Sequence, residues 1–599
     1  MTDLAHFWAA LPQIGNIHAS ADGNWAYFTQ SGPHETDEVY AVPCDASVPP
    51  TRLTHGEDHF LIRDVSPDGN RLILAQSRHA CEHDHLLLLD RATRVLTLLT
   101  PVQSSHYVYG GTFTRDGKAI IFCTDYDYGT ETVIEGGMVW HQNLATGTRT
   151  RLARTDHFFD IPPRVSPDGG KILLNLNDRK PGSTQLWVMA SDGADLTEVL
   201  CLGETNNTRG DWIDADRIAF VTDHLGRDRL GVLTLSTGQI DWLAGEPDVF
   251  PHQIVPGTVG HFAVICHDQS RSFAMVHDGT ALRVQPNHSG RRSLVPHASL
   301  PDGGWLAEAY DASAPHQLVR VLPDGTCLEL TRAARFSTPH IPQDFRWTAP
   351  DGRPCQGWLY PPEGPSNGFI AYIHGGPTWH SEDWVNPKVQ FWVASGFTVL
   401  DPNYRGSTGF GYAQREAVKE DGWGGREQAD IRAGIEAAVV AGFASPGRIA
   451  VAGNSYGGFS SWFAITHHAD LVTAAIPMCG MYRLDIDYHQ TEMPHGRAYS
   501  EEMMGGTPEQ FPEKYANASP GNFIDQIRGH VMIVHGLADS NVGPENTHTA
   551  VRELTAAGIP HQVMLFENEG HGVFRRSNAE TYLAASAAFL IRAFEGTDP

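Results

Sequence analysis

A short phrase recurs through the first half of the chain. It reads "SADGNWAYF" at Ser20, "SPDGNRLIL" at Ser66, "TRDGKAIIF" at Thr114, "SPDGGKILL" at Ser166 and "LPDGGWLAEA" at Leu300. Each copy is an Asp-Gly turn followed by strand-forming residues, since glycine accepts the positive φ of a tight turn. The Asp positions 22, 68, 116 and 168 are 46, 48 and 52 residues apart, and a weaker copy, "DWIDADRIAFV", places Asp214 another 46 residues on. The remaining interval has room for one degenerate unit near "GHFAVICHD".

These repeats predict a β-propeller. A second phrase closes the units, as "PPTRLT", "RVLTLLT", "TRTRLA" and "GTCLELT". About seven units of about 47 residues result, which is the period of four-stranded propeller blades. The period is too long for an open β-solenoid and too regular for stacked sandwiches. We therefore expect a seven-bladed β-propeller.

After Thr331 the pattern changes. "FRWTAPDGRPCQGWLYPPEG" is typical of a hairpin and linker, and apolar strands such as "GFIAYIHGG" and "RIAVAGNS" then alternate with helical stretches. Helices are predicted over residues 426–441, 459–469, 545–557 and 579–594. Alternating apolar strands and helices indicate a parallel sheet covered on both faces by helices.

Charge and cysteine usage narrow the function classes. The formal net charge is −27, which disfavours binding to nucleic acid or to anionic membranes, because both need a basic surface. The first residues lack a basic segment followed by an apolar core, and no window approaches 18 continuous apolar residues, so neither a signal peptide nor a membrane span is predicted. The eight cysteines contain no CxxC pair, which favours reduced thiols in a cytoplasmic protein.

The stretch "VAGNSYGGFS" raises the question of whether Ser455 is a nucleophile. It follows an apolar strand and precedes a helix, within the pattern Gly453-x-Ser455-x-Gly457. In such an elbow, small residues let the backbone turn sharply and hold the serine Oγ clear of the sheet. The N–H of Tyr456, at the helix N-terminus, can then face a developing oxyanion.

A serine hydroxyl needs a base and an orienting acid. The loop "LADSNV" after the strand "VMIVHG" offers Asp539, and "ENEGHGVF" offers His571. The order Ser455, Asp539, His571 is that of an α/β-hydrolase triad, and each residue follows a parallel strand, where sites gather in open α/β sheets. The glycine-rich turn "YIHGGPTWH" adds the Gly376 N–H as a second oxyanion donor. The alternative is that Asp539 is a turn residue, that His571 is an ordinary histidine and that Ser455 belongs to a phosphate-binding or structural turn.

These motifs also carry a resemblance. "HGGP" at His374, "NYRGSTGFG" at Asn403, "GNSYGG" at Gly453, "HGLADSNV" at His535 and "EGHG" at Glu569 resemble the prolyl oligopeptidase family of serine peptidases, most closely its acylaminoacyl-peptidase branch. The resemblance implies an α/β-hydrolase domain over residues 345–599 behind a propeller over residues 1–344. The N-terminal segment of that first domain can pack on the hydrolase. The resemblance further implies a hydrolase of short peptides, in which the propeller excludes folded proteins by size. Ser455, Asp539 and His571 match the family triad, and Gly376 and Tyr456 its oxyanion donors.

The resemblance also bears on the substrate. Dipeptidyl peptidases of the family hold a free N-terminus with paired glutamates on the propeller, and residues 1–344 contain no Glu-Glu. Arg497 stands where acylaminoacyl peptidases have an arginine that binds a substrate carbonyl. An Arg suits this role because its guanidinium can donate paired hydrogen bonds. The alternative is a surface ion pair with Glu501, one helical turn away.

The P1 side chain is expected to meet apolar walls. Met478, Met481 and Leu484 occupy positions that match the aromatic walls of proline-cutting relatives, with Val542 and Tyr456 nearby. Flexible apolar residues suit varied side chains better than the flat proline ring. The prediction is a hydrophobic P1 preference that is not strictly proline-selective.

No metal site and no cofactor are predicted. In "RHACEHDHLL", His79, Cys81, His83 and His85 alternate and would share one face of a strand, but the stretch is typical of a polar hairpin tip. The function expected is peptide or acyl-peptide hydrolysis by a cytoplasmic serine enzyme, which leaves open a homo-oligomer. The alternatives are an amidase or esterase acting on a small metabolite, dipeptidyl or aminopeptidase action, and a silent propeller that binds a protein partner.

Overall fold

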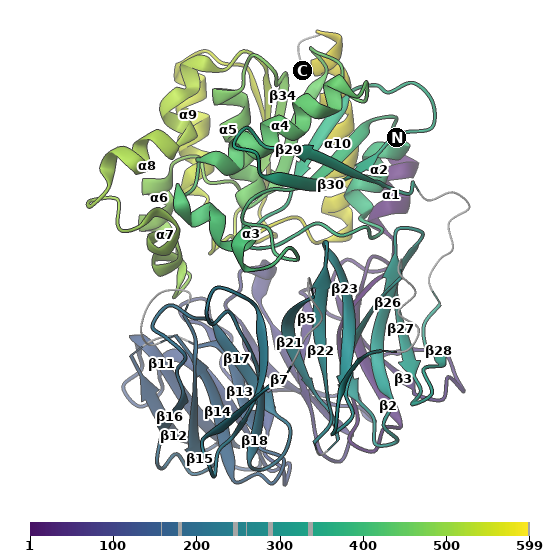
Figure 1. Cartoon of the computed structure of the whole chain (residues 1–599), viewed down its shortest axis with the longest axis vertical. Coiled ribbons are helices and arrows are strands. Elements are labelled where there is room, and N and C mark those ends of the chain that lie inside the picture. Colours follow the sequence, from purple (N-terminus) through teal and green to yellow (C-terminus); the bar gives the residue numbers. More distant parts are fainter. Residues whose placement is uncertain are drawn as a thin grey trace.

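The computed structural model describes the chain except residues 157–158, 178–182, 244–248, 259, 286–291, 333–339 and 597–599. Two bodies stack on one another in Figure 1: a ring of small sheets, and above it a single larger sheet wrapped by helices.

The ring consists of seven four-stranded antiparallel sheets, each built from consecutive strands. The first four sheets comprise β1–β4 (Gln13–Ala19, Trp25–Ser31, Glu38–Pro43, Thr51–Arg52), β5–β8 (Phe60–Val65, Arg71–Gln76, His85–Asp90, Leu96–Leu98), β9–β12 (Val108–Phe113, Ala119–Asp127, Thr132–Asn143, Arg149–Thr155) and β13–β16 (Phe159–Val165, Lys171–Leu176, Gln185–Ala190, Thr197–Leu200). The last three comprise β17–β20 (Thr208–Trp212, Arg217–Thr222, Arg229–Thr234, Gln239–Leu243), β21–β24 (Phe250–Pro256, Phe262–Asp268, Arg271–His277, Leu282–Val284) and β25–β28 (Ser293–Ser299, Trp305–Asp311, Ala314–Val321, Cys327–Glu329).

The repeated phrase forms the turn between the first two strands of a blade. In the first blade, Ser20 Oγ donates to Asp22 Oδ1 at 2.6 Å and accepts from the Trp25 N–H at 2.9 Å, while Gly23 has φ +70°. Serine, aspartate and glycine therefore each have a separate part in closing the turn. The pair Ser166 and Asp168 repeats the hydroxyl–carboxylate bond at 2.6 Å.

The ring closes by packing. Side chains of the first blade, among them Ile17 and Phe28, share one buried cluster with Leu306 and Leu318 of the seventh. No strand from one end of the chain completes the sheet at the other, because each described blade contains consecutive strands only. Hydrophobic burial between blades holds the two ends of the ring together.

The second body is an eight-stranded sheet of order β29-β30-β32-β31-β33-β34-β35-β36, parallel from β32 to β36. Its strands are β29 (Gln343–Thr348), β30 (Pro354–Tyr360), β31 (Phe369–Ile373), β32 (Thr398–Asn403), β33 (Ile449–Asn454), β34 (Ala474–Met478), β35 (His530–Gly536) and β36 (His561–Phe566). The domain boundary predicted between residues 344 and 345 lies inside β29.

Helices cover both faces of this sheet. They are α1 (Thr2–Ala9), α2 (Pro387–Ala394), α3 (Tyr412–Glu416), α4 (Arg426–Val440), α5 (Tyr456–His467), α6 (Leu484–Gln490), α7 (Gly496–Met504), α8 (Pro512–Ala518), α9 (Glu545–Ala556) and α10 (Arg576–Glu595), with short 3₁₀ turns η1 (Arg78–Ala80), η2 (Ala417–Glu420) and η3 (Pro520–Gln526). One buried cluster lies beneath α4, α5 and α9, and the other lies beneath α2 and α10.

Helix α1 leaves the ring and packs on the upper body. Ala5 and Trp8 are buried in the same cluster as α2 and α10, and Figure 1 shows the three helices side by side. The predicted architecture, a seven-bladed β-propeller followed by an α/β-hydrolase domain, is confirmed.

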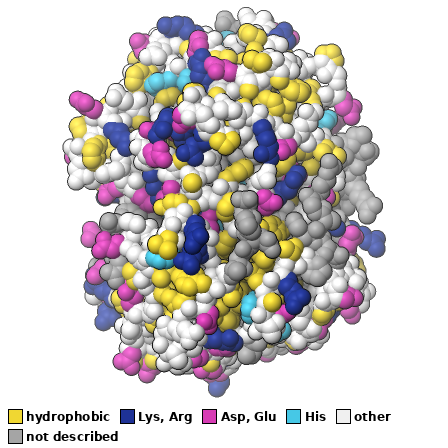
Figure 2. Space-filling model, viewed as in Figure 1, with side chains coloured by type: hydrophobic (Ala, Val, Ile, Leu, Met, Phe, Trp, Pro, Cys, Tyr) yellow, Lys and Arg dark blue, Asp and Glu magenta, His cyan; other side chains and the backbone are white. Residues whose placement is uncertain are grey.

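The surface is consistent with the acidic composition. On the face shown in Figure 2, Lys and Arg side chains are interspersed with Asp and Glu side chains. Within the described part of the chain, the search for a helix long and apolar enough to cross a bilayer found none.

Candidate active site

Ser455 occupies a sharp turn between β33 and α5. Its backbone has φ 59° and ψ −122°, a conformation that is strained for a residue with a side chain. A Cβ added at Gly453 or Gly457 would lie 2.5 or 2.0 Å from the Ile373 carbonyl oxygen of β31. The glycines on either side of Ser455 are therefore required by the close approach of the turn to the neighbouring strand.

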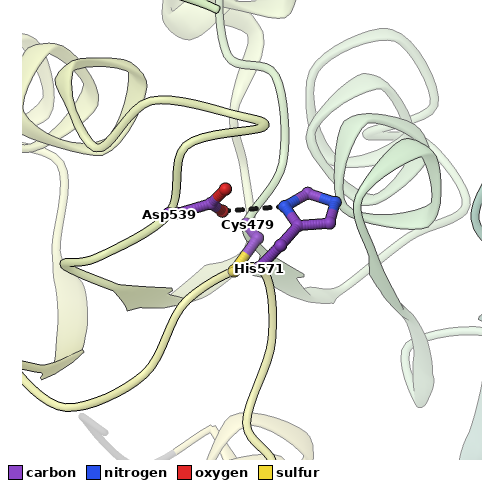
Figure 3. A group of neighbouring side chains, drawn as sticks. All are labelled: Cys479, Asp539 and His571. Atoms are coloured by element: carbon purple, nitrogen blue, oxygen red, sulfur yellow. Dashed lines mark hydrogen bonds and ion pairs between the residues drawn. The ribbon is translucent and has the colours of Figure 1, made fainter. Parts of the chain in front are cut away.

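His571 and Asp539 come from the loops after β36 and β35. Figure 3 shows the two side chains pointing toward one another, with His571 Nδ1 2.8 Å from Asp539 Oδ2. The other oxygen, Asp539 Oδ1, accepts the N–H groups of Asn541 at 2.9 Å and Val542 at 3.0 Å. The carboxylate is thus fixed by its own loop, and it holds the imidazole in one orientation.

The two groups shift each other's pKa. Burial alone would lower the pKa of His571, but the charge of Asp539 and the hydrogen bond to it outweigh burial, so the pKa is raised. Burial would raise the pKa of Asp539, yet His571 and His535 together hold it well below its ordinary value. Asp539 therefore stays ionised beside the imidazole.

Ser455 and His571 line one cavity of about 590 Å³ between the two domains. Its far wall comes from the propeller, with Asn207 and His252 among the lining residues. Within the described chain, no hydrogen bond joins the Ser455 hydroxyl to the imidazole in this state. Such bonds often tighten only when substrate is bound.

The predicted oxyanion donors lie beside the nucleophile. Gly376 lines the same cavity with φ +115°, and Tyr456 is the first residue of α5. Neither backbone N–H donates to a described residue. Both amides remain available to a substrate oxygen.

The structure divides the predicted substrate residues. Met481, Leu484 and Val542 lie with Tyr456 in one buried cluster, whereas Met478 lies in the cluster on the opposite face of the sheet. None of the four is among the residues that line the cavity of Ser455 and His571, so their contact with a P1 side chain stays a prediction.

Arg497 is the second residue of α7, and its guanidinium lies against the C-terminal end of α6. It donates to the carbonyl oxygens of Tyr488 at 3.2 Å and His489 at 3.4 Å, while Glu501 accepts from the Tyr488 hydroxyl at 2.6 Å. The guanidinium therefore caps a helix C-terminus, where cations are favourable. The residues on either side of Arg497 in the sequence, Gly496 and Ala498, line the cavity.

The sequence prediction missed a thiol beside the triad. Cys479, directly after β34, offers a sulfur that lies within 4.8 Å of ligand atoms of both Asp539 and His571 (Figure 3). Among the described residues, Cys479, Asp539 and His571 form the group of His, Cys and acidic side chains that are close enough to share a metal ion. The histidines near residue 81 do not belong to such a group. Burial raises the pKa of the thiol well above its ordinary value, so Cys479 is protonated at neutral pH.

Two further acids stand near His571, Glu82 from the propeller and Asp487 from α6. Glu82 belongs to the stretch expected to be a polar hairpin tip. That connection instead reaches the catalytic domain, where Ser540 Oγ donates to the Cys81 carbonyl at 2.7 Å. No pattern within a blade indicates which loops face a second domain, so the sequence offered no signal for this contact.

A strained serine elbow and an Asp–His pair in an α/β-hydrolase domain that is stacked on a propeller define a serine hydrolase. Comparisons with known proteins give the family: residues 384–597 match the prolyl oligopeptidase family. The match to the prolyl oligopeptidase family thus lies in the catalytic domain, and the protein is a serine hydrolase, as predicted.

Relatives cover nearly the whole chain. It is 28% identical to dipeptidyl aminopeptidase BIII of Pseudoxanthomonas mexicana, over 98% of this chain and 87% of the relative. A Mycobacterium tuberculosis puromycin-hydrolyzing peptidase shares the fold with a TM-score of 0.84 at 21% identity, over 100% of this chain and 96% of that one. The Pyrococcus horikoshii acylaminoacyl peptidase shares it with a TM-score of 0.77 at 15% identity, over 98% and 97%.

Proposed function

We propose that this protein hydrolyses peptide bonds of short peptides through Ser455, His571 and Asp539. Ser455 Oγ attacks the scissile carbonyl while His571 takes its proton. The amides of Gly376 and Tyr456 stabilise the oxyanion, and His571 then protonates the leaving amine. Water releases the acyl-enzyme by the same steps.

The observation that carries this proposal is the 2.8 Å contact between His571 Nδ1 and Asp539 Oδ2, beside a strained serine that lines the same cavity. Strain of this kind persists only when the surrounding structure imposes it, and it gathers at active sites. The cavity lies between the propeller and the catalytic domain. This position favours short, flexible substrates.

The P1 preference proposed is for hydrophobic side chains, without strict selectivity for proline. Met481, Leu484 and Val542 are each at most 5% exposed and belong to one cluster with Tyr456. Methionine and leucine adapt to varied shapes, so proline has no special advantage. Chromogenic anilides of Ala, Leu, Phe and Pro measure this preference, and a proline rate far above the other three contradicts it.

The mechanism is tested by Ser455→Ala and by a fluorophosphonate probe. We expect the variant to lose turnover while its thermal unfolding is preserved, and the probe to label Ser455 alone in the wild type. Retention of full activity by Ser455→Ala would falsify the mechanism. A ratio of ester to peptide kcat/KM separates a peptidase from an esterase acting on a small metabolite.

A further inference from the structure

A second large cavity lies beside the catalytic one, and neither Ser455 nor His571 lines it. Its volume is about 760 Å³, within the range of cavities that hold small ligands. The fifth blade (β17–β20) and the sixth blade (β21–β24) supply two walls, and the segment Phe410–Ala413 of the catalytic domain supplies the third. We call this space the blade cavity.

The wall from the catalytic domain is packed closely against both blades. Gly411 has φ +83°, and a Cβ added there would lie 2.6 Å from the ring of Phe250 in the sixth blade. A Cβ at Gly226 of the fifth blade would lie 3.6 Å from the ring of Tyr412. The blade cavity is therefore bounded by both domains rather than by the propeller alone.

The interior of the blade cavity is mainly apolar. Among the described residues, aliphatic and aromatic side chains from all three walls line it: Leu230, Leu243, Phe250, Met275, Leu282 and Phe410. Leu230 and Met275 are at most 5% exposed and belong to the buried cluster between the two blades. A hydrocarbon chain that replaced water against these walls would gain free energy from burial.

Two arginines of the blade cavity have no carboxylate partner. Arg227 and Arg229 both line it, and within the described chain neither makes an ion pair or a side-chain hydrogen bond. Asp228 between them is paired with Arg415 at 3.0 Å. The Arg229 guanidinium lies 3.6 Å from the centre of the Trp242 ring, which also lines the cavity. Burial and the charge of Arg227 lower the pKa of Arg229, so an anion that reached both groups would relieve their repulsion.

We propose that the blade cavity binds a fatty-acid-like ligand, with its carboxylate at Arg227 and Arg229 and its unbranched chain against the apolar walls. A guanidinium matches the geometry of a carboxylate and can donate paired hydrogen bonds to it. Leucine and methionine side chains adapt to a flexible chain. The described walls of the two cavities share Asp228 and Pro251 but no catalytic residue, so this inference goes beyond the proposed peptidase function.

Calorimetric titration of the full chain tests the site. The probes are hexanoate, octanoate and decanoate, with decyltrimethylammonium as an amphiphile of equal chain length and opposite charge. We expect saturable binding of one decanoate, at least tenfold tighter than decyltrimethylammonium. Affinity should rise about fourfold for each added methylene, as burial of the chain requires.

The variants are Arg229→Gln and Arg227→Gln, each expected to weaken decanoate binding about tenfold or more. Arg94→Gln, at an exposed arginine in a turn of the second blade, is the matched control and keeps the wild-type affinity. Arg227 is exposed, so its replacement tests the site even if Arg229→Gln fails to fold. Decanoate that binds no tighter than decyltrimethylammonium, or that binds Arg227→Gln as tightly as the wild type, overturns the proposal.

Discussion

At the scale of single residues, the proposed mechanism makes His571 the group that sets the pH dependence of the enzyme. Its pKa is raised above the ordinary value of 6.5 by Asp539, although burial acts in the opposite direction. A general base must be neutral, so kcat/KM falls as pH drops through this raised pKa and levels off above it. We expect the acidic limb of the pH profile above 6.5.

The Asp539→Asn variant separates the effect of the carboxylate from that of burial. Without Asp539, the pKa of His571 falls, the acidic limb moves to lower pH, and kcat drops by about 10⁴-fold because the tautomer is lost. Glu545→Gln, a surface carboxylate at the start of α9, is a suitable control. An acidic limb that stays in place in Asp539→Asn contradicts this account.

The sequence predicted Ser455, Asp539 and His571 as a triad because each lies in the segment after a parallel strand, and the carboxyl ends of such strands meet at one edge. Asp487, Cys479 and Glu82 could not be predicted. Their approach to His571 depends on how α6 packs, on the turn after β34 and on which propeller loop faces the other domain. The order of residues along the chain contains none of this information.

At the scale of elements, the elbow depends on Gly457. An alanine Cβ would lie 2.0 Å from the Ile373 carbonyl, a backbone atom that cannot move alone, so α5 must shift. We expect Gly457→Ala to lower kcat by about 100-fold or more, as small misplacements of reacting groups do. Gly15→Ala serves as control, since its Cβ would meet only Thr29 Oγ1 at 3.7 Å. A wild-type kcat in Gly457→Ala would show that the turn accommodates a Cβ at this position without displacing α5.

Helix α1 is expected to stabilise the catalytic domain. Trp8 is 5% exposed beneath α10, whereas its neighbour Phe7 is 47% exposed. Trp8→Ala should lower the free energy of unfolding by about 3–5 kcal/mol, measured by chemical denaturation, and Phe7→Ala by clearly less. Equal losses for the two variants would argue against α1 as part of the core.

Helix periodicity was a reliable guide to the catalytic domain. Residues 426–441 and 545–557 were predicted helical, and α4 and α9 cover Arg426–Val440 and Glu545–Ala556. Helix α5 begins at Tyr456, before the predicted residue 459, because the strained Ser455 starts the helix at once. The helix α1 was not predicted, since eight residues are too few for a clear periodic pattern.

At the scale of the whole molecule, we expect the cavity between the domains to select substrates by size. The reacting residues lie between the domains, and ion pairs such as Arg271–Asp383 at 2.8 Å and Arg575–Asp58 at 2.9 Å hold the domains together. We expect kcat/KM to fall steadily along a series of unstructured peptides of increasing length that share one cleavage site. Cleavage of a folded protein as fast as the shortest peptide would rule out this selection.

The position of α1 also constrains biosynthesis. This helix precedes the propeller strands in the chain, yet it packs against α10, which follows the last strand of the catalytic sheet. The blades between them are complete once Glu329 has been synthesised. The ring can therefore assemble before α10, the helix against which α1 packs, exists. We therefore expect a nascent chain to complete its propeller before its catalytic domain, and to gain hydrolase activity only after α10 has been synthesised.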